Sequence, residues 1–237
     1  MDFDGTLSDI VPRPDDARPR AEAVPLLHAL VDRYQVVGIV SGRPVEFLRA
    51  HLPVPGLALV GQYGLERSVG DRVEEDPRAE PFLDAVADAA GRADAELPGV
   101  LVERKGRIAL TLHWREDQGQ ADAVLAWADH IAASTGLTLY PTRMAVELRP
   151  PVGVDKGDAV TTLVEPARVA MFAGDDHGDL AAFDALAAAE RRAALDAVVR
   201  VAVRSPEEPA ELVARTDVGV AGPAGFVGLL AALAAAE

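Results

Sequence analysis

Apolar and polar positions along residues 21–64 alternate between a helical periodicity and short strand-like runs. Apolar residues recur at helical spacing over 21–34 and 46–52, and β-branched or apolar runs occupy 35–43 and 56–64. This order of helices and strands implies parallel strands joined by helical crossovers, because parallel neighbours need a long connection. The pattern therefore predicts an α/β fold, in which ligands bind at the carboxyl ends of the strands.

The middle of the chain has a different pattern, a helix followed by a hairpin, which occurs twice. Helices are expected over 80–97 and 117–134, with hairpins over 99–115, turning at 105–107, and over 137–151, turning near Pro141 and Thr142. After 151 the α/β alternation resumes, with helices over 156–167, 179–197, 208–217 and 226–237 and strands over 168–176, 198–205 and 218–222. The pattern predicts an α/β core formed by 1–67 and 150–237, with an α+β domain inserted at 68–149.

Composition narrows the function classes. The formal net charge is −15, from 38 acidic and 23 basic residues, and no basic run is present, which argues against a nucleic-acid partner. The absence of cysteine excludes disulfides and a thiol nucleophile. No apolar stretch approaches the roughly 18 residues of a membrane span, and no secretory signal opens the chain. We expect a soluble, cytoplasmic monomer with neither a membrane nor a nucleic-acid partner.

Four polar segments are expected where strands of the core end. They are DFDGT at 2–6, SGR at 41–43, Lys156, and GDDHGD at 174–179. Each is weak alone, because Asp-Gly and Ser-Gly pairs end many strands. Three acids close together in the last segment repel one another unless a cation neutralises them. The four segments in this order therefore predict one site at the carboxyl edge of the sheet.

Phosphoryl transfer is the chemistry that suits these groups. Asp2, Asp175 and Asp179 offer the hard oxygen ligands that Mg²⁺ prefers, and a carboxylate also serves as a nucleophile toward phosphorus. Lys156 supplies fixed positive charge, while Ser41 and Thr6 supply hydrogen bonds to a phosphate. Asp4 is placed to protonate the leaving oxygen and later to activate water.

The motifs DxDGT, Ser after the second strand, Lys and GDDxxD resemble the haloacid dehalogenase superfamily of phosphatases. Further segments are similar to the trehalose-6-phosphate phosphatase family: SGRP, GQYGLE, ERKGRIALTLHWR, VELRPP and AGDDHGDLAAF. The resemblance implies a doubly wound, Rossmann-like haloacid dehalogenase core with an inserted α+β cap domain. It also implies hydrolysis of trehalose 6-phosphate to trehalose and phosphate through an aspartyl-phosphate intermediate.

The resemblance also implies roles for individual residues. Asp2 would be the nucleophile and Asp4 the general acid and base. Mg²⁺ would be held by Asp2, the backbone carbonyl of Asp4, and Asp175, with Asp179 nearby. The groups that would contact the substrate, at the phosphate or at the sugar, are Ser41, Lys156, Thr6, Gly42, Arg43, Lys105, Arg115 and Glu147. Arg43 is open to two interpretations, contact with the phosphate or pairing with an acid.

Three departures from the family pattern keep alternatives open. The family usually carries His where Tyr63 stands and Thr where Gly178 stands, and only Met1 precedes Asp2 in place of an apolar strand of about 5 residues. We therefore expect the natural start to lie upstream. The alternatives are a phosphatase of another sugar phosphate, such as sucrose phosphate, and a catalytically impaired or truncated regulatory homologue.

Overall fold

The computed structural model describes residues 1–142, 144–205 and 209–236, which form two compact units. Unit 1 comprises Met1–Glu74 and Val154–Glu237, and unit 2 comprises Glu75–Gly153. Each unit has its own buried apolar core. The assignment of 68–149 as a domain for substrate specificity stays a prediction.

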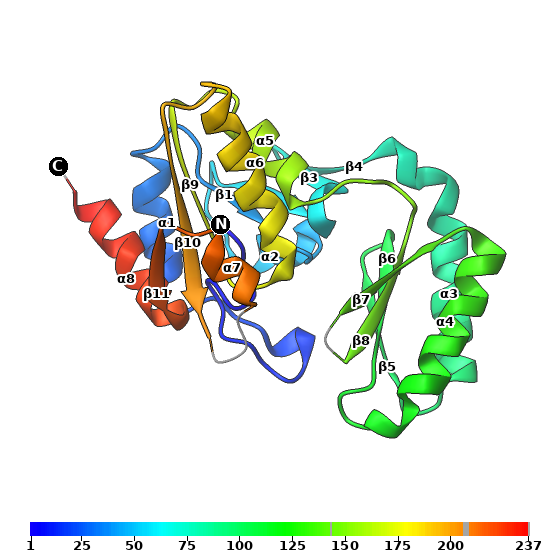
Figure 1. Ribbon diagram of the computed structural model, residues 1–237. Coiled ribbons are helices and arrows are strands. Elements are labelled where there is room, and N and C mark those ends of the chain that lie inside the picture. Colours follow the sequence, from blue (N-terminus) through cyan, green and yellow to red (C-terminus); the bar gives the residue numbers. More distant parts are fainter. Residues whose placement is uncertain (143, 206–208, 237) are drawn as a thin grey trace. The chain divides into compact units, whose positions relative to one another are not determined.

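Parallel strands form the centre of unit 1 (Figure 1). One group pairs β1 (Gly38–Val40) with β2 (Ala58–Gly61), and the other has the order β11 (Val218–Ala221), β10 (Ala197–Arg204), β9 (Val169–Gly174). The first two residues of the chain connect the groups, because the Asp2 amide donates to the Ala173 carbonyl and the Val40 amide donates to the Met1 carbonyl, both at 2.9 Å. Asp2 is thereby held between the carboxyl ends of β1 and β9.

Helices cover both faces of these strands. The core that contains Ile39, Val201 and Val203 is lined by α1 (Ala23–Val31), α2 (Val45–His51) and α8 (Gly222–Ala235). The core that contains Val40 and Ala202 is lined by α5 (Lys156–Val164), α6 (Leu180–Arg191) and α7 (Ala210–Ala214). Successive strand residues point to opposite faces, so both faces of a buried strand must be apolar. The expected doubly wound α/β core is confirmed.

One pair of strands in unit 1 was not expected from the sequence. β3 (Glu66–Val69) pairs antiparallel with β2, and β4 (Arg72–Glu75) follows it at the edge of the same sheet. Polar residues dominate both strands, so no apolar pattern marks them. Short 3-10 turns occupy Pro14–Asp16, Gln62–Gly64, Pro77–Phe82, Gln118–Gln120 and His177–Asp179.

Unit 2 is an antiparallel sheet with two helices on one face. The strands have the order β5 (Leu101–Lys105), β6 (Ala109–His113), β8 (Ala145–Arg149), β7 (Thr138–Thr142), and α3 (Leu83–Glu96) and α4 (Ala121–Thr135) complete the unit. Leu110, Leu112, Val146 and Leu148 pack in one core with residues of both helices. The two expected helix-plus-hairpin units are both present. The turn expected near Pro141 and Thr142 lies later, because both residues belong to β7, and position 143 is outside the described residues.

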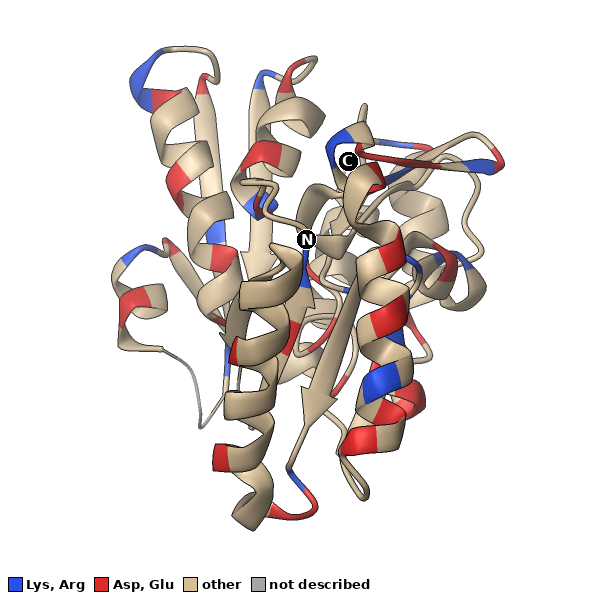
Figure 2. Cartoon of the chain, turned by 90° about the vertical axis from the view of Figure 1, so that its right-hand side faces the viewer, with Lys and Arg blue, Asp and Glu red and all other residues tan. Residues whose placement is uncertain are grey.

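The described helices include none with the combined length and apolar content that a membrane crossing demands. Acidic positions are spread over the elements of the chain, with the fewer basic positions dispersed among them (Figure 2). The negative charge is therefore a property of the whole chain rather than of one patch.

Candidate active site

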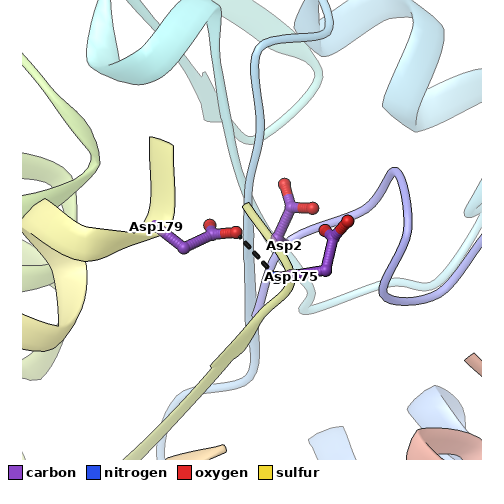
Figure 3. Close-up of side chains that lie close together, drawn as sticks. All are labelled: Asp2, Asp175 and Asp179. Atoms are coloured by element: carbon purple, nitrogen blue, oxygen red, sulfur yellow. Dashed lines mark hydrogen bonds between the residues drawn. The ribbon is translucent and has the colours of Figure 1, made fainter. Parts of the chain in front are cut away.

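Three carboxylates come together where the strands of unit 1 end. Asp2, Asp175, which follows β9, and Asp179, which precedes α6, each offer an oxygen within 4.8 Å of the others. Figure 3 shows Asp179 extending toward the backbone of Asp175, with Asp2 beside them. Asp179 Oδ2 accepts hydrogen bonds from the backbone amides of Asp175 at 2.9 Å and Asp176 at 3.2 Å. Asp179 therefore fixes the loop that carries Asp175.

Lys156 binds two of these carboxylates. Its Nζ donates to Asp2 Oδ1 at 2.8 Å and to Asp179 Oδ1 at 2.7 Å, and its side chain is 4% exposed. Lys156 is the first residue of α5. The start of α5 is fixed by a capping box, in which the side chains of Asp155 and Asp158 each accept a hydrogen bond from the backbone amide of the other. The chain has two lysines, Lys105 and Lys156, and both are buried in ion pairs. A compact ammonium with three donors suits such a crowded position better than a guanidinium.

Burial dominates the electrostatics of the cluster. It raises the pKa of Asp2 to about 8 although Lys156 opposes the shift, and it raises the pKa of Asp175 to about 9 with help from the charges of Asp2 and Asp179. Burial also raises the pKa of Asp179 to about 6. Burial disfavours the charged form of Lys156, but Asp179 and Asp2 raise its pKa well above the ordinary value. One lysine therefore does not balance three buried acids, and an additional cation would.

Asp4 lies in a different environment from Asp2. Arg43 holds it in a bidentate ion pair, with Nε 2.8 Å from Oδ2 and Nη2 2.7 Å from Oδ1. Arg43 also donates to the Pro14 carbonyl and lies 4.6 Å from the centre of the Phe47 ring. Of the two interpretations of Arg43, pairing with an acid is the one seen in the structure. The pair orients the Asp4 carboxylate and leaves the other cation of the site, Lys156, to Asp2 and Asp179.

The remaining predicted residues of unit 1 surround the same cluster. Thr6 Oγ1 donates to Asp175 Oδ1 at 3.5 Å, and Ser41 Oγ accepts from the Arg43 amide at 3.2 Å. Gly5 has a φ of +76°, and a Cβ there would come within 2.1 Å of Asp175 Oδ2. Only glycine permits both this conformation and this approach. Glycine at position 5 is thus needed for Asp175 to lie against residues 2–6.

Unit 2 carries its polar groups on the sheet face opposite the helices. Glu147, which is 1% exposed, accepts from Lys105 Nζ at 2.6 Å and from Thr111 Oγ1 at 3.4 Å. The Arg149 Nη1 atom is 3.7 Å from Glu147 Oε1, and its guanidinium lies 3.4 Å from the centre of the Tyr140 ring. The predicted Lys105 and Glu147 are therefore brought together within the unit.

Two further residues of unit 2 do not take part in the contacts of Glu147. Arg115 follows β6 in an exposed bend, away from the strand positions that carry Lys105 and Glu147. His113 pairs through Nε2 with Glu103 Oε2 at 2.8 Å. Sequence reasoning did not single out Arg149 and Thr111. Strand alternation places Arg149 on the same face as Glu147 and would have pointed to Arg149.

The chain matches the family model described as trehalose-phosphatase over residues 1–213. It is 36% identical over 200 residues to a protein named an uncharacterized glycosyl hydrolase of Mycobacterium tuberculosis, covering 78% of this chain and 15% of that protein. It is also 36% identical over 198 residues to a trehalose-phosphate phosphatase of Mycobacterium avium, covering 78% of this chain and 50% of that protein. The chain therefore spans half or less of the length of these curated relatives.

Solved structures share the fold. A crystal structure of a trehalose-6-phosphate phosphatase related protein superposes with a TM-score of 0.81 at 24% identity, covering 99% of this chain and 95% of that one. A haloacid dehalogenase-like hydrolase from Bacteroides thetaiotaomicron superposes with a TM-score of 0.67 at 13% identity, covering 98% and 97% of the two chains. The haloacid dehalogenase-like fold expected from the sequence is confirmed.

Proposed function

This chain belongs to the trehalose-phosphatase family, and we propose that it hydrolyses trehalose 6-phosphate to trehalose and phosphate with bound Mg²⁺. The observation that carries the proposal is the cluster of Asp2, Asp175, Asp179 and Lys156 at the carboxyl edge of the parallel strands. This is the edge where α/β folds bind ligands. The cluster offers groups suited to act as nucleophile, cation ligands and phosphate-binding ammonium.

The donor set fits a hard divalent cation. The clustered ligands are carboxylate oxygens, which Mg²⁺ prefers over nitrogen or sulfur. Burial, with repulsion between the carboxylates, raises the pKa of all three acids, which supports a role for an added positive charge there. Asp2 and Asp175 would hold the ion, together with the backbone carbonyl of Asp4. When bound, Mg²⁺ supplies charge that offsets the repulsion between the carboxylates and a phosphate.

Asp2 is the group we assign to attack on phosphorus. Its Oδ1 is held by Lys156, which orients the carboxylate and leaves a third N–H donor of the ammonium for the phosphate. Asp4 would protonate the leaving sugar oxygen and then deprotonate the water that cleaves the aspartyl-phosphate. Arg43 keeps the Asp4 carboxylate in a single orientation through its two hydrogen bonds. Ser41 and Thr6 would donate to phosphate oxygens.

We assign recognition of the sugar to unit 2, in which Glu147 and Lys105 form the buried ion pair of the polar sheet face. Carboxylates and cations each bond several hydroxyls, so such a pair suits a disaccharide. Arg115 lies in the exposed bend after β6, apart from this pair, and a contact of Arg115 with the sugar stays a prediction. The residues that carry specificity are thus separate from those that carry the chemistry.

Removing the metal is expected to lower stability as well as activity. At a concentration 100 times its dissociation constant, Mg²⁺ should stabilise the chain by about 2.7 kcal/mol, which raises Tm by roughly 5–10 °C for a chain of this size. Thermal unfolding with Mg²⁺ or with a chelator measures this difference. The Asp175→Asn variant should lose the rise in Tm caused by Mg²⁺. Asp32→Asn, an exposed control in the same unit, should keep that rise.

Replacing Glu147 with glutamine is expected to raise KM for trehalose 6-phosphate about tenfold, equivalent to ~1.4 kcal/mol of binding. The reason is the loss of a charged acceptor and of the partner of Lys105. Hydrolysis of p-nitrophenyl phosphate, which has no sugar, should change little. Asp129→Asn on α4 is the matched control, because α4 packs against the other face of the sheet. Equal losses with both substrates would contradict a role in sugar recognition.

A catalytically silent homologue remains the candidate of a different class. Turnover decides between the two, since both would bind a sugar phosphate. Purified chain with Mg²⁺ should release phosphate from trehalose 6-phosphate, and a chelator should stop the release. Binding of trehalose 6-phosphate without any turnover would overturn the proposal.

A further inference from the structure

Tyr63 has an unusual backbone and lies beside the candidate active site. Both Gln62 and Tyr63 have left-handed conformations, with φ of +53° and +59°. Residues other than glycine adopt this region infrequently, and such residues gather at functional sites when the surroundings hold them. Gln62 is buried and Tyr63 is half-buried in the turn after β2. The cause of the conformation therefore lies in what the turn contacts.

Backbone hydrogen bonds attach this turn to the loop that follows β1, residues 41–43, here called the phosphate loop. The Tyr63 amide donates to the Ser41 carbonyl at 3.0 Å, and the Gln62 amide donates to the Arg43 carbonyl at 3.0 Å. The left-handed φ of Gln62, which lies between these two amides, accompanies their common direction toward the phosphate loop. The turn and the phosphate loop are thus connected at both ends.

The Tyr63 ring contacts a glycine of that loop. A Cβ at Gly42 would lie 2.7 Å from both Cζ and Oη of Tyr63, closer than real carbon contacts permit. The nearest atoms to that Cβ all belong to the Tyr63 side chain. Glycine at position 42 therefore makes room for the ring.

The opposite part of the ring approaches the loop that carries the acids, residues 175–179, here called the acidic loop. A Cβ at Gly178 would lie 3.8 Å from Tyr63 Cε1 and equally far from Lys156 Cε. The ring thus stands between the phosphate loop and the acidic loop, next to the stem of Lys156. Both loops present glycine where the ring passes.

We propose that Tyr63 is a positioning residue whose ring sets the separation of the phosphate loop and the acidic loop, so that one phosphate group is bound by both. The inference rests on the proposed function, because it concerns the same site. It adds a residue whose part is steric: the ring keeps the two loops apart, and its removal lets them shift together. The phosphate would then lose either Ser41 or Lys156.

Binding of orthovanadate, a phosphate-shaped oxyanion, in the presence of Mg²⁺ tests the proposal without requiring turnover. Calorimetry on the full chain should show binding about tenfold weaker or more in Tyr63→Ala. Tyr63→Phe, which keeps the ring, should bind vanadate nearly as tightly as the wild-type chain does. The Mg²⁺ concentration that gives half of the metal-dependent rise in Tm should increase in Tyr63→Ala and not in Tyr63→Phe. Wild-type vanadate and Mg²⁺ affinities in Tyr63→Ala would overturn the proposal.

A second variant keeps the test decisive if Tyr63→Ala unfolds. Gly42→Ala adds a methyl that collides with the Tyr63 side chain, so it should weaken vanadate binding about tenfold as well. Gly228→Ala, where an added Cβ meets nothing within 4 Å, is the matched control in the same unit and should bind vanadate as the wild-type chain does. Wild-type vanadate affinity in Gly42→Ala would show that the ring does not set the loop position.

The same experiment separates this inference from the proposed function. If the wild-type chain binds vanadate with Mg²⁺ but releases no phosphate from trehalose 6-phosphate, the proposed function fails, while the two sets of variants still decide the role of Tyr63. If the wild-type chain binds no vanadate, the inference is wrong as well.

Discussion

The Asp2→Asn variant is expected to lose phosphate release, with kcat lower by roughly 10³-fold or more. An amide oxygen is a poor nucleophile, and the neutral side chain gives up one ligand of the cation. Asp2 is buried, and its Oδ1 accepts a hydrogen bond from Lys156. The rate of phosphate release with Mg²⁺ measures the effect.

The stability of the same variant should move in the opposite direction. Burial raises the pKa of Asp2 to about 8, so the charged carboxylate is disfavoured in the fold at neutral pH. Asparagine removes that cost, and Tm without metal should be equal to or higher than that of the unmodified chain. Asp32→Asn again serves as the exposed control for activity. Retained activity in Asp2→Asn would contradict the assignment of the nucleophile.

Replacing Lys156 with methionine is expected to give the largest loss of stability. The change leaves Asp2 and Asp179 buried without their shared cation, and breaking a buried pair in this way costs about 3–5 kcal/mol. The corresponding fall in Tm is roughly 6–20 °C for a chain of this size. Thermal unfolding in the presence of a chelator measures the stability lost with the Lys156 charge alone, because bound Mg²⁺ would supply part of that charge.

Lys156→Arg is the informative companion, because it retains the charge. The guanidinium is larger than the ammonium and its donors have a fixed geometry, and Lys156 is 4% exposed in its side chain. We expect Tm to recover in part and kcat to stay low, because the phosphate must share the space around Nζ. A fully active Lys156→Arg would show that the lysine acts only as a charge.

The sequence predicted those parts of the molecule in which local pattern and burial agree. β1, β9 and β10 are β-branched or apolar runs because both of their faces are buried, and the acids that follow β9 are visible as a motif. The β3–β4 hairpin was missed because its strands are mostly polar, and β4 lies at the sheet edge. Apolar periodicity does not mark strands in which polar residues occupy both faces.

The sequence predicted which residues meet in the candidate site, but not which of them bind each other. Asp2, Asp175, Asp179 and Lys156 meet as expected, since parallel strands end at one edge. The bidentate pair of Arg43 with Asp4 joins residues 39 positions apart, and nothing in either segment specifies it. The place of Tyr63 depends on two left-handed residues, which sequence patterns do not reveal.

Specificity constants for different sugar phosphates identify the substrate of this chain. We propose to measure kcat/KM with Mg²⁺ for trehalose 6-phosphate, sucrose 6-phosphate and glucose 6-phosphate on one preparation. Trehalose 6-phosphate should be preferred by at least about tenfold, which is ~1.4 kcal/mol of transition-state binding. A higher kcat/KM for either of the other sugar phosphates would contradict it.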